Sequence, residues 1–155
     1  MYDFDKYKKR DFTQDCDGLV FQDEKIEFNK IKQEFYPGLC SVDILEKKEN
    51  KIIFIEIKRL EKKIKDLKKK YKNEEAAKRI FLKDLKECFT DSLLILKLGF
   101  PDYLPENTDY IFLICACETN QRDIQAFDYI RQSISVMLKN IGKVQLITKS
   151  YLASS

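Results

Sequence analysis

The fold of this chain is decided by the stretch KIIFIEIKRLEKKIKDLKKKY, residues 51–71. Its first part, residues 51–58, is rich in β-branched and aromatic side chains and predicts a strand. From Leu60 to Tyr71, apolar residues recur at helical spacing between lysines, which predicts an amphipathic helix with Tyr71 in the core. A strand-to-helix junction is therefore expected near Arg59.

The flanking sequence extends this pattern in both directions. Residues 41–46 are expected to pair with the strand as a hairpin around a turn at 47–50, and an earlier hairpin is expected with arms at 19–21 and 26–28 around the turn-like residues 22–25. Downstream, the periodicity predicts a helix at 74–98, a buried strand at 110–116, a helix at 123–140 with Ile124, Phe127, Ile134 and Ile141 inward, and a last strand at 144–148. This order predicts an α/β (α+β) fold with a mixed sheet flanked by helices.

The composition of the chain limits its size class and its chemistry. With 155 residues, of which 44% are hydrophobic, the chain fits one domain spanning residues 1–155. The sequence contains no histidine, which excludes Ser-His-Asp hydrolases, Cys-His proteases and histidine-based zinc enzymes or nucleases. Catalysis would therefore rest on carboxylates, lysine, cysteine or tyrosine, with or without a metal.

Cysteine usage and hydropathy give an expectation of the compartment. The five cysteines form no scaffold-like spacing, and the first residues lack the apolar stretch of a signal peptide, so reduced cysteines and a cytoplasmic location are expected. Cys115 and Cys117 are expected to be buried core residues. The longest apolar run, residues 110–117, is far shorter than the roughly twenty residues that span a bilayer, so no membrane partner is expected.

The charge of the chain is unevenly distributed. Nine Lys or Arg residues against two acids lie between Lys58 and Lys72, a local net charge of +7 in a chain whose total is +3. Clustered basic charge is typical of a polyanion partner such as nucleic acid, although for the run taken alone a solvated helix face is the simpler explanation.

Asp43, Glu56 and Lys58 form the constellation that carries chemistry. Alternation places Glu56 and Lys58 on one face of the strand at 51–58, and Asp43 on the partner arm of the hairpin should lie near Glu56. Two adjacent carboxylates favour a cation between them, and hard oxygen ligands favour Mg²⁺, with Mn²⁺ as a substitute. The backbone carbonyl of Ile57 is a further candidate ligand. Lysine beside such an ion can position the attacking water.

These residues resemble the signature of the PD-(D/E)xK nuclease superfamily, an acidic residue at the start of one strand and Glu-x-Lys on the next. Ser41-Val42-Asp43 matches the first part, and IIFIEIKR, residues 52–59, matches the second. The resemblance implies a restriction-endonuclease-like fold with an αβββαβ core, and metal-dependent cleavage of DNA, less often of RNA. Asp43 and Glu56 would be metal ligands and Lys58 would act on the nucleophile.

The chain departs from the family pattern upstream of this motif. Many members carry an additional acid on a helix before the first strand, and Glu34 and Glu27 are the candidates for that position. Target recognition would come from a second copy of the chain or a partner protein subunit. Two alternatives stay open: a catalytically inactive nuclease-fold subunit that binds nucleic acid or serves as a scaffold, and a small α/β module that binds RNA by shape and charge.

Overall fold

A computed structural model describes residues 3–153 of the chain. Its strands are β1 (Lys8–Asp11), β2 (Val20–Glu27), β3 (Ile44–Lys48), β4 (Lys51–Lys58), β5 (Asp109–Ala116) and β6 (Lys143–Thr148). Its α-helices are α1 (Phe28–Phe35), α2 (Leu60–Tyr71), α3 (Glu74–Gly99), α4 (Asp128–Met137) and α5 (Lys149–Ala153). Short 3₁₀ turns lie at Asp5–Tyr7, Pro101–Tyr103 and Ile124–Phe127. None of the helices within these residues is long and apolar enough to cross a membrane.

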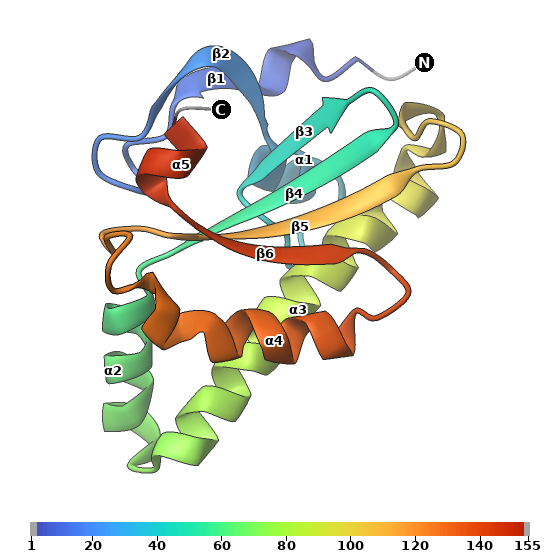
Figure 1. The fold of residues 1–155 in the computed structure, drawn as a ribbon. Helices are drawn as coiled ribbons and strands as arrows, with labels where there is room; N and C mark the ends of the chain where they lie inside the picture. The colour runs from blue at the N-terminus through green and yellow to red at the C-terminus, as the bar shows by residue number, and fades with distance from the viewer. Residues whose placement is uncertain (1–2, 154–155) are drawn as a thin grey trace.

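The six strands form one mixed sheet in the order β1-β2-β3-β4-β5-β6. The pairings from β1 to β4 are antiparallel, and β4–β5 and β5–β6 are parallel. Parallel neighbours require crossovers, which α2 with α3 provides between β4 and β5, and α4 between β5 and β6 (Figure 1). The predicted mixed sheet flanked by helices is confirmed.

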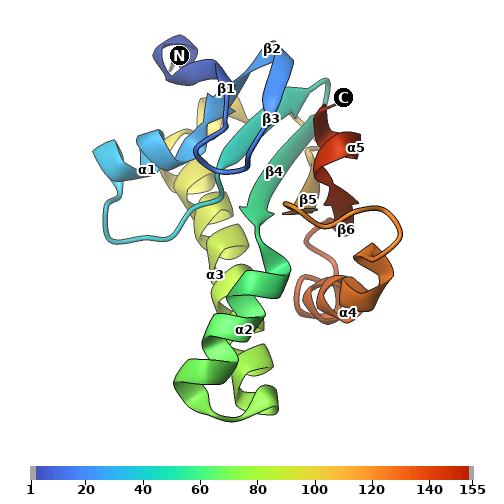
Figure 2. The ribbon, with the colours of Figure 1, turned by 90° about the vertical axis from the view of Figure 1, so that its left-hand side faces the viewer.

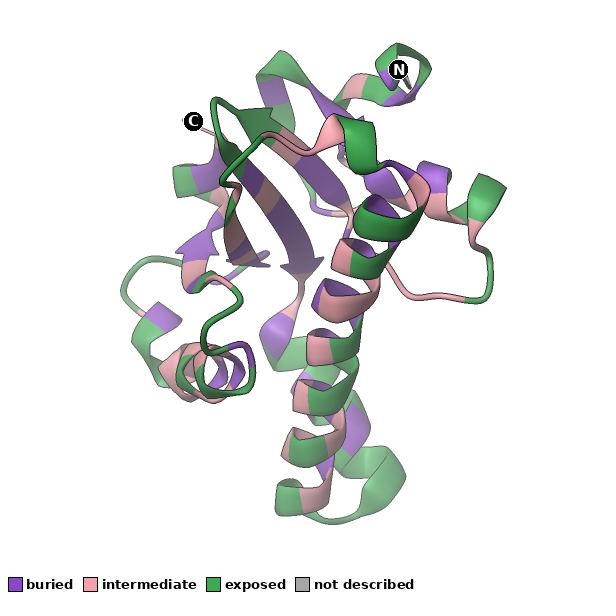
Figure 3. Ribbon diagram, turned by 90° about the vertical axis from the view of Figure 1, so that its right-hand side faces the viewer, coloured by how far each residue is buried: buried purple, intermediate pink, exposed green. Residues whose placement is uncertain are grey.

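Both faces of β4 are buried. Phe54 lies on the face covered by the long helices, where its ring stacks on Phe112 at 5.5 Å between centroids, and Phe89 of α3 packs on Phe112. Ile55 and Ile57 lie on the other face, in a second cluster with the 12–19 loop and α5. Figure 3 shows the buried residues concentrated on the central strands and exposed residues along the outward face of the long helix. Strand β4 is therefore central to both hydrophobic layers.

Helices α2 and α3 form a hairpin whose tip projects beyond the sheet (Figure 2). Helix α2 ends at Tyr71, and the capping residue Lys72 adopts the left-handed conformation with φ of 52°. Asn73 then caps α3, because its side chain accepts a hydrogen bond from the Ala76 amide at 3.1 Å. The projecting hairpin exposes most of the lysine run to solvent.

The expected hairpin at residues 19–28 is wrong. Residues 20–27 form one continuous strand, β2, and the following residues form α1. The polar residues 22–25 resemble a turn but belong to a strand near the sheet edge, where most of them are exposed. Phe28 and Ile31 are fully buried at helical spacing and attach α1 to the main core.

Two expected core residues and one helix boundary also differ from the sequence expectation. Tyr71 is 40% exposed and Ile141 is 42% exposed, so neither is a core residue. Tyr71 is the last residue of α2, and Ile141 follows the end of α4, so both lie where the backbone leaves the packed layer. The helix expected at 123–140 is a 3₁₀ turn followed by the shorter α4. Strand β1 and helix α5 had no sequence signal strong enough to predict them.

Four of the five cysteines are paired, so the expectation of reduced thiols is wrong for these four. Cys16 bonds Cys117 and Cys40 bonds Cys88, whereas Cys115 is a free, buried thiol. The expected burial of Cys115 and Cys117 is confirmed. The pairs are 101 and 48 residues apart in sequence, so no local spacing could reveal them.

Gly142 occupies a position where a side chain has no room. A Cβ atom there would lie 2.5 Å from the Tyr110 carbonyl oxygen and 2.6 Å from a ring carbon of Phe112. Gly142→Ala is therefore expected to lower the free energy of unfolding by about 1–3 kcal/mol, measured by chemical denaturation. Gly38→Ala is the matched control, because a Cβ there meets nothing within 4 Å. Equal stability of the two variants would contradict the prediction.

Candidate active site

The β3–β4 hairpin brings Asp43 and Glu56 together as the sequence predicts. Ile44 pairs with Ile55 across the ladder, and the Asp43 amide donates to the Ile55 carbonyl at 3.1 Å, which places Asp43 opposite Glu56 at the end of the ladder. The Asp43 carboxylate accepts a hydrogen bond from the Ile57 amide at 2.8 Å. The backbone of β4 thus orients the Asp43 side chain toward Glu56, which lies on the same strand as Ile57.

Glu56 is a buried carboxyl group, with 3% of its surface exposed. Burial raises its pKa well above the ordinary value, and the charge of Asp43 and a hydrogen bond between the two carboxyl groups raise the pKa further. Lys58 and the Ile57 amide act in the opposite direction but more weakly. Two carboxyl groups in contact hold a proton between them unless a cation replaces it, so the pair is chemically suited to bind one.

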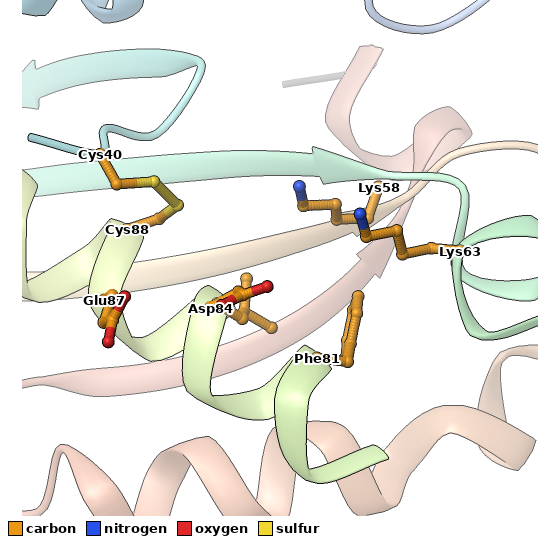
Figure 4. A pocket seen from close by; sticks show the side chains of 8 residues that line it. Cys40, Lys58, Lys63, Phe81, Asp84, Glu87 and Cys88 are labelled. Carbon is orange, nitrogen blue, oxygen red and sulfur yellow. A yellow bond between two sulfur atoms is a disulfide. The ribbon is translucent and has the colours of Figure 1, made fainter. Parts of the chain in front are cut away.

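Lys58 lies two residues beyond Glu56, on the same face of β4. Its half-buried side chain lines a pocket of about 250 Å³ between the end of β4 and the helices α2 and α3. Figure 4 shows Lys58 and Lys63 reaching into this pocket, with Asp84 facing them from α3. The predicted trio of Asp43, Glu56 and Lys58 therefore shares one end of the β3–β4 hairpin, and Lys58 connects it to an open pocket.

The segment that precedes Asp43 is anchored to α3 at adjacent positions. The Cys40–Cys88 disulfide joins it to the helix, and the Cys40 amide donates to the Asp91 carboxylate at 3.0 Å. The Val42 amide donates to the Ser92 hydroxyl at 2.9 Å. Since Ser92 is fully buried, this contact fixes the backbone one residue before Asp43.

The structure separates the two candidates for an additional acid. Glu34 lies on the exposed side of α1, where it contacts the Tyr7 hydroxyl and Lys6. Glu27 ends β2 opposite Ile44, beside Asp43, and its carboxylate binds Lys9 of β1. Glu27 is therefore adjacent to the candidate site, and Glu34 is not.

Asp15 belongs to the same acidic neighbourhood, which the sequence did not indicate. It lies in the loop between β1 and β2, and its pKa is raised by burial first and then by the negative charge of Asp43, with a smaller contribution from Glu27. Lys9 lowers the Asp15 pKa. Only the folding of this loop over the sheet brings Asp15 near the hairpin, so no spacing in the sequence could have identified it.

The donor set fits a magnesium site with few protein ligands. Within residues 3–153, no three Asp, Glu or Cys side chains converge closely enough to hold a metal ion. Asp43 and Glu56 supply two carboxylates, and Mg²⁺ is commonly held by one or two carboxylates together with waters and a substrate phosphate. The role of the Ile57 carbonyl as a ligand stays a prediction, whereas its amide already binds Asp43.

Comparisons with known proteins identify no family for this chain. The chain matches no protein-family model, no curated protein and no solved structure.

Proposed function

We propose that the chain is a magnesium-dependent nuclease that hydrolyses phosphodiester bonds, with DNA rather than RNA as the expected substrate. The observation that carries this proposal is the contact between the carboxyl groups of Asp43 and Glu56, with Lys58 on the same strand face beside an open pocket. In a chain without histidine, a carboxylate pair with a lysine is the apparatus available for such hydrolysis.

Each residue of the trio has a defined task in this proposal. Asp43 and Glu56 would hold Mg²⁺ through carboxylate oxygens, and Mn²⁺ would substitute for it. The ion, when bound, acidifies a water and offsets negative charge on the attacked phosphate. The Lys58 ammonium group donates hydrogen bonds that orient the attacking water and stabilise charge on a phosphate oxygen.

The order of elements supports a restriction-endonuclease-like core, with one departure. Strands β2, β3 and β4 are antiparallel neighbours, and β5 follows in parallel after the helices α2 and α3. This corresponds to the βββαβ part of the αβββαβ order. The departure is α1, which lies between β2 and β3 rather than before the three strands.

The test is calorimetry with Mn²⁺ combined with cleavage of labelled DNA. Wild-type chain is expected to bind the ion and to cleave, Asp43→Asn to lose both properties, and Lys58→Ala to bind the ion without cleaving. Glu34→Gln is the matched acidic control, since its side chain lies outside the site. Cleavage at the wild-type rate by Asp43→Asn or Lys58→Ala would contradict the proposal.

The rival function is a nuclease-fold subunit that binds nucleic acid without cleaving it. One observation favours it: in the described part of the chain only two carboxylates meet at the hairpin, and no third completes a metal-binding group. In that case the wild-type chain would bind DNA but would bind no Mn²⁺. The same calorimetry therefore separates the two functions.

A further prediction concerns the acids around the pair. Glu27→Gln is expected to weaken Mn²⁺ binding by about tenfold, because Glu27 adds negative charge beside Asp43 and outer groups of a metal site commonly have effects of this size. Glu34→Gln is expected to leave the dissociation constant unchanged. A reversed order of the two effects in calorimetry would show that Glu27 is not part of the site.

A further inference from the structure

The pocket beside Lys58 is lined by charged groups of both signs. Lys63 contributes a second ammonium group from α2, and Asp84 and Glu87 contribute carboxylates from α3, of which Glu87 lies 3.9 Å from the Lys83 ammonium group. Figure 4 shows the two lysines reaching over the pocket and Asp84 turned toward them. Across residues 3–153, Lys58, Lys63 and Asp84 form no ion pair, so these three charges are available to a ligand.

The pocket also has an apolar wall. Phe81 and Leu85 line it from α3, and both belong to the main core, with 2% and 1% of their surfaces exposed. The Cys40–Cys88 disulfide closes one side. A complementary ligand therefore has an anionic group for the lysines, a hydrogen-bond donor for Asp84, and an apolar part for the small surface that Phe81 and Leu85 leave at the base of the pocket.

A nucleotide has all three of these parts. Its phosphate is the anion, its base has an apolar face, and its exocyclic amino group or ring N–H is a donor that a carboxylate accepts, as in contacts between Asp or Glu and cytosine. An inorganic anion would use only the lysines. A purely apolar ligand would bury the three charges without partners, which is unfavourable.

We propose that this pocket holds one unstacked nucleotide of the substrate strand, next to the phosphate that Lys58 contacts. The inference rests on the proposed nuclease function and narrows its substrate to nucleic acid with an unpaired base at the cleavage point. A base inside a duplex must leave the stack to enter a pocket, whereas a single strand presents its bases without that cost. Single-stranded nucleic acid is therefore the substrate class that the pocket fits.

The binding test is an NMR titration of the full chain, without divalent metal, using cytidine 5′-monophosphate as the probe and inorganic phosphate in parallel. The nucleotide is expected to bind more tightly than phosphate. Lys63→Ala and Asp84→Asn are each expected to weaken nucleotide binding by about tenfold, the effect of losing one charge-assisted hydrogen bond. Asp84→Asn should leave phosphate binding unchanged.

Two variants with the same charge changes serve as controls. Lys48→Ala removes an exposed β3 lysine outside the pocket, and Glu75→Gln removes an exposed α3 carboxylate outside it. Both are expected to bind the nucleotide like wild type. Equal affinity for nucleotide and phosphate, or wild-type nucleotide binding by both Lys63→Ala and Asp84→Asn, would overturn the proposal.

A cleavage assay distinguishes failure of the pocket from failure of the nuclease. A single strand is expected to be cut at least about tenfold faster than the same sequence in a duplex. Extruding a base from a duplex costs a few kcal/mol, and each 1.4 kcal/mol corresponds to about a factor of ten. A preference for duplex overturns the pocket while the nuclease stands. Nucleotide binding that depends on Lys63 and Asp84, in a chain that cleaves neither substrate, supports the pocket and overturns the nuclease.

Discussion

Glu56→Gln is expected to abolish Mg²⁺-dependent cleavage and, at the same time, to stabilise the folded chain near neutral pH. Removal of one ligand carboxylate should lower the cleavage rate by at least about 10²–10³-fold, the loss typical of a group that stabilises transition-state charge. Glutamine has nearly the same shape, remains neutral in the buried position and can donate a hydrogen bond to Asp43. The free energy of unfolding should therefore rise by about 0.5–2 kcal/mol, the size typical of substitutions that remove a destabilising charge from a functional site.

The pH dependence of this gain follows from the raised pKa of Glu56. Since the folded state holds this proton more tightly than the unfolded state, the stability contributed by the group is complete below its ordinary pKa of 4.5. That stability is lost as the pH rises toward and through the raised pKa of the folded state. Glu56→Gln lacks the titrating group, so its advantage over wild type should grow from acidic to neutral pH.

Urea denaturation at a series of pH values, with and without Mg²⁺, measures both parts of this prediction. Mg²⁺ should stabilise the wild-type chain, because the ion binds only the folded pair, and should leave Glu56→Gln unchanged. Retained cleavage, or a variant less stable than wild type at neutral pH, would be incompatible with a buried carboxyl pair that serves as a cation site.

Replacement of Lys62, Lys65 and Lys69 together by alanine is expected to have the largest effect on nucleic-acid binding. All three are exposed on α2, in the projecting helical hairpin. If each contacts a phosphate, the slope of log affinity against log salt should fall by about 2–3, and affinity at low salt should fall by about 10²-fold. Alanine maintains the helix, so the fold should be unaffected.

Fluorescence anisotropy with a labelled single strand at several salt concentrations provides the measurement. The matched control replaces Lys48, Lys51 and Lys143, which lie at the opposite end of the sheet from Lys58. This control should retain the wild-type slope. A similar loss in both triple variants would mean that binding follows the total charge of the chain and not the surface of α2.

The sequence predicts the elements whose signals are local. Strand β4 and its hairpin with β3 follow from the apolar run at 52–57 and the polar turn at 47–50, and α2 follows from the spacing of Leu60, Ile64 and Leu67. The sequence wrongly predicts a hairpin in place of strand β2, because the polar residues of β2 lie near the sheet edge, where only the short β1 is its outer neighbour. Edge exposure depends on neighbours that local periodicity does not describe.

The same distinction applies to the candidate site. Asp43 and Glu56 could be placed together because one short hairpin determines their register. Asp15 approaches them only through the fold of the β1–β2 loop, and the partner of Cys40 lies on α3, 48 residues away. Long-range packing of this kind leaves no trace in the spacing of residues along the chain.

The position of Glu56 within a hairpin also has a consequence for the order of folding. The hairpin closes over a short turn, whereas β4 can pair with β5 only after the chain has passed through α2 and α3. We therefore expect the acidic pair to meet while still in contact with water. Packing of the rest of the chain around β4 then buries the Glu56 carboxyl group, so this late step should take up either a proton or a cation from the solution.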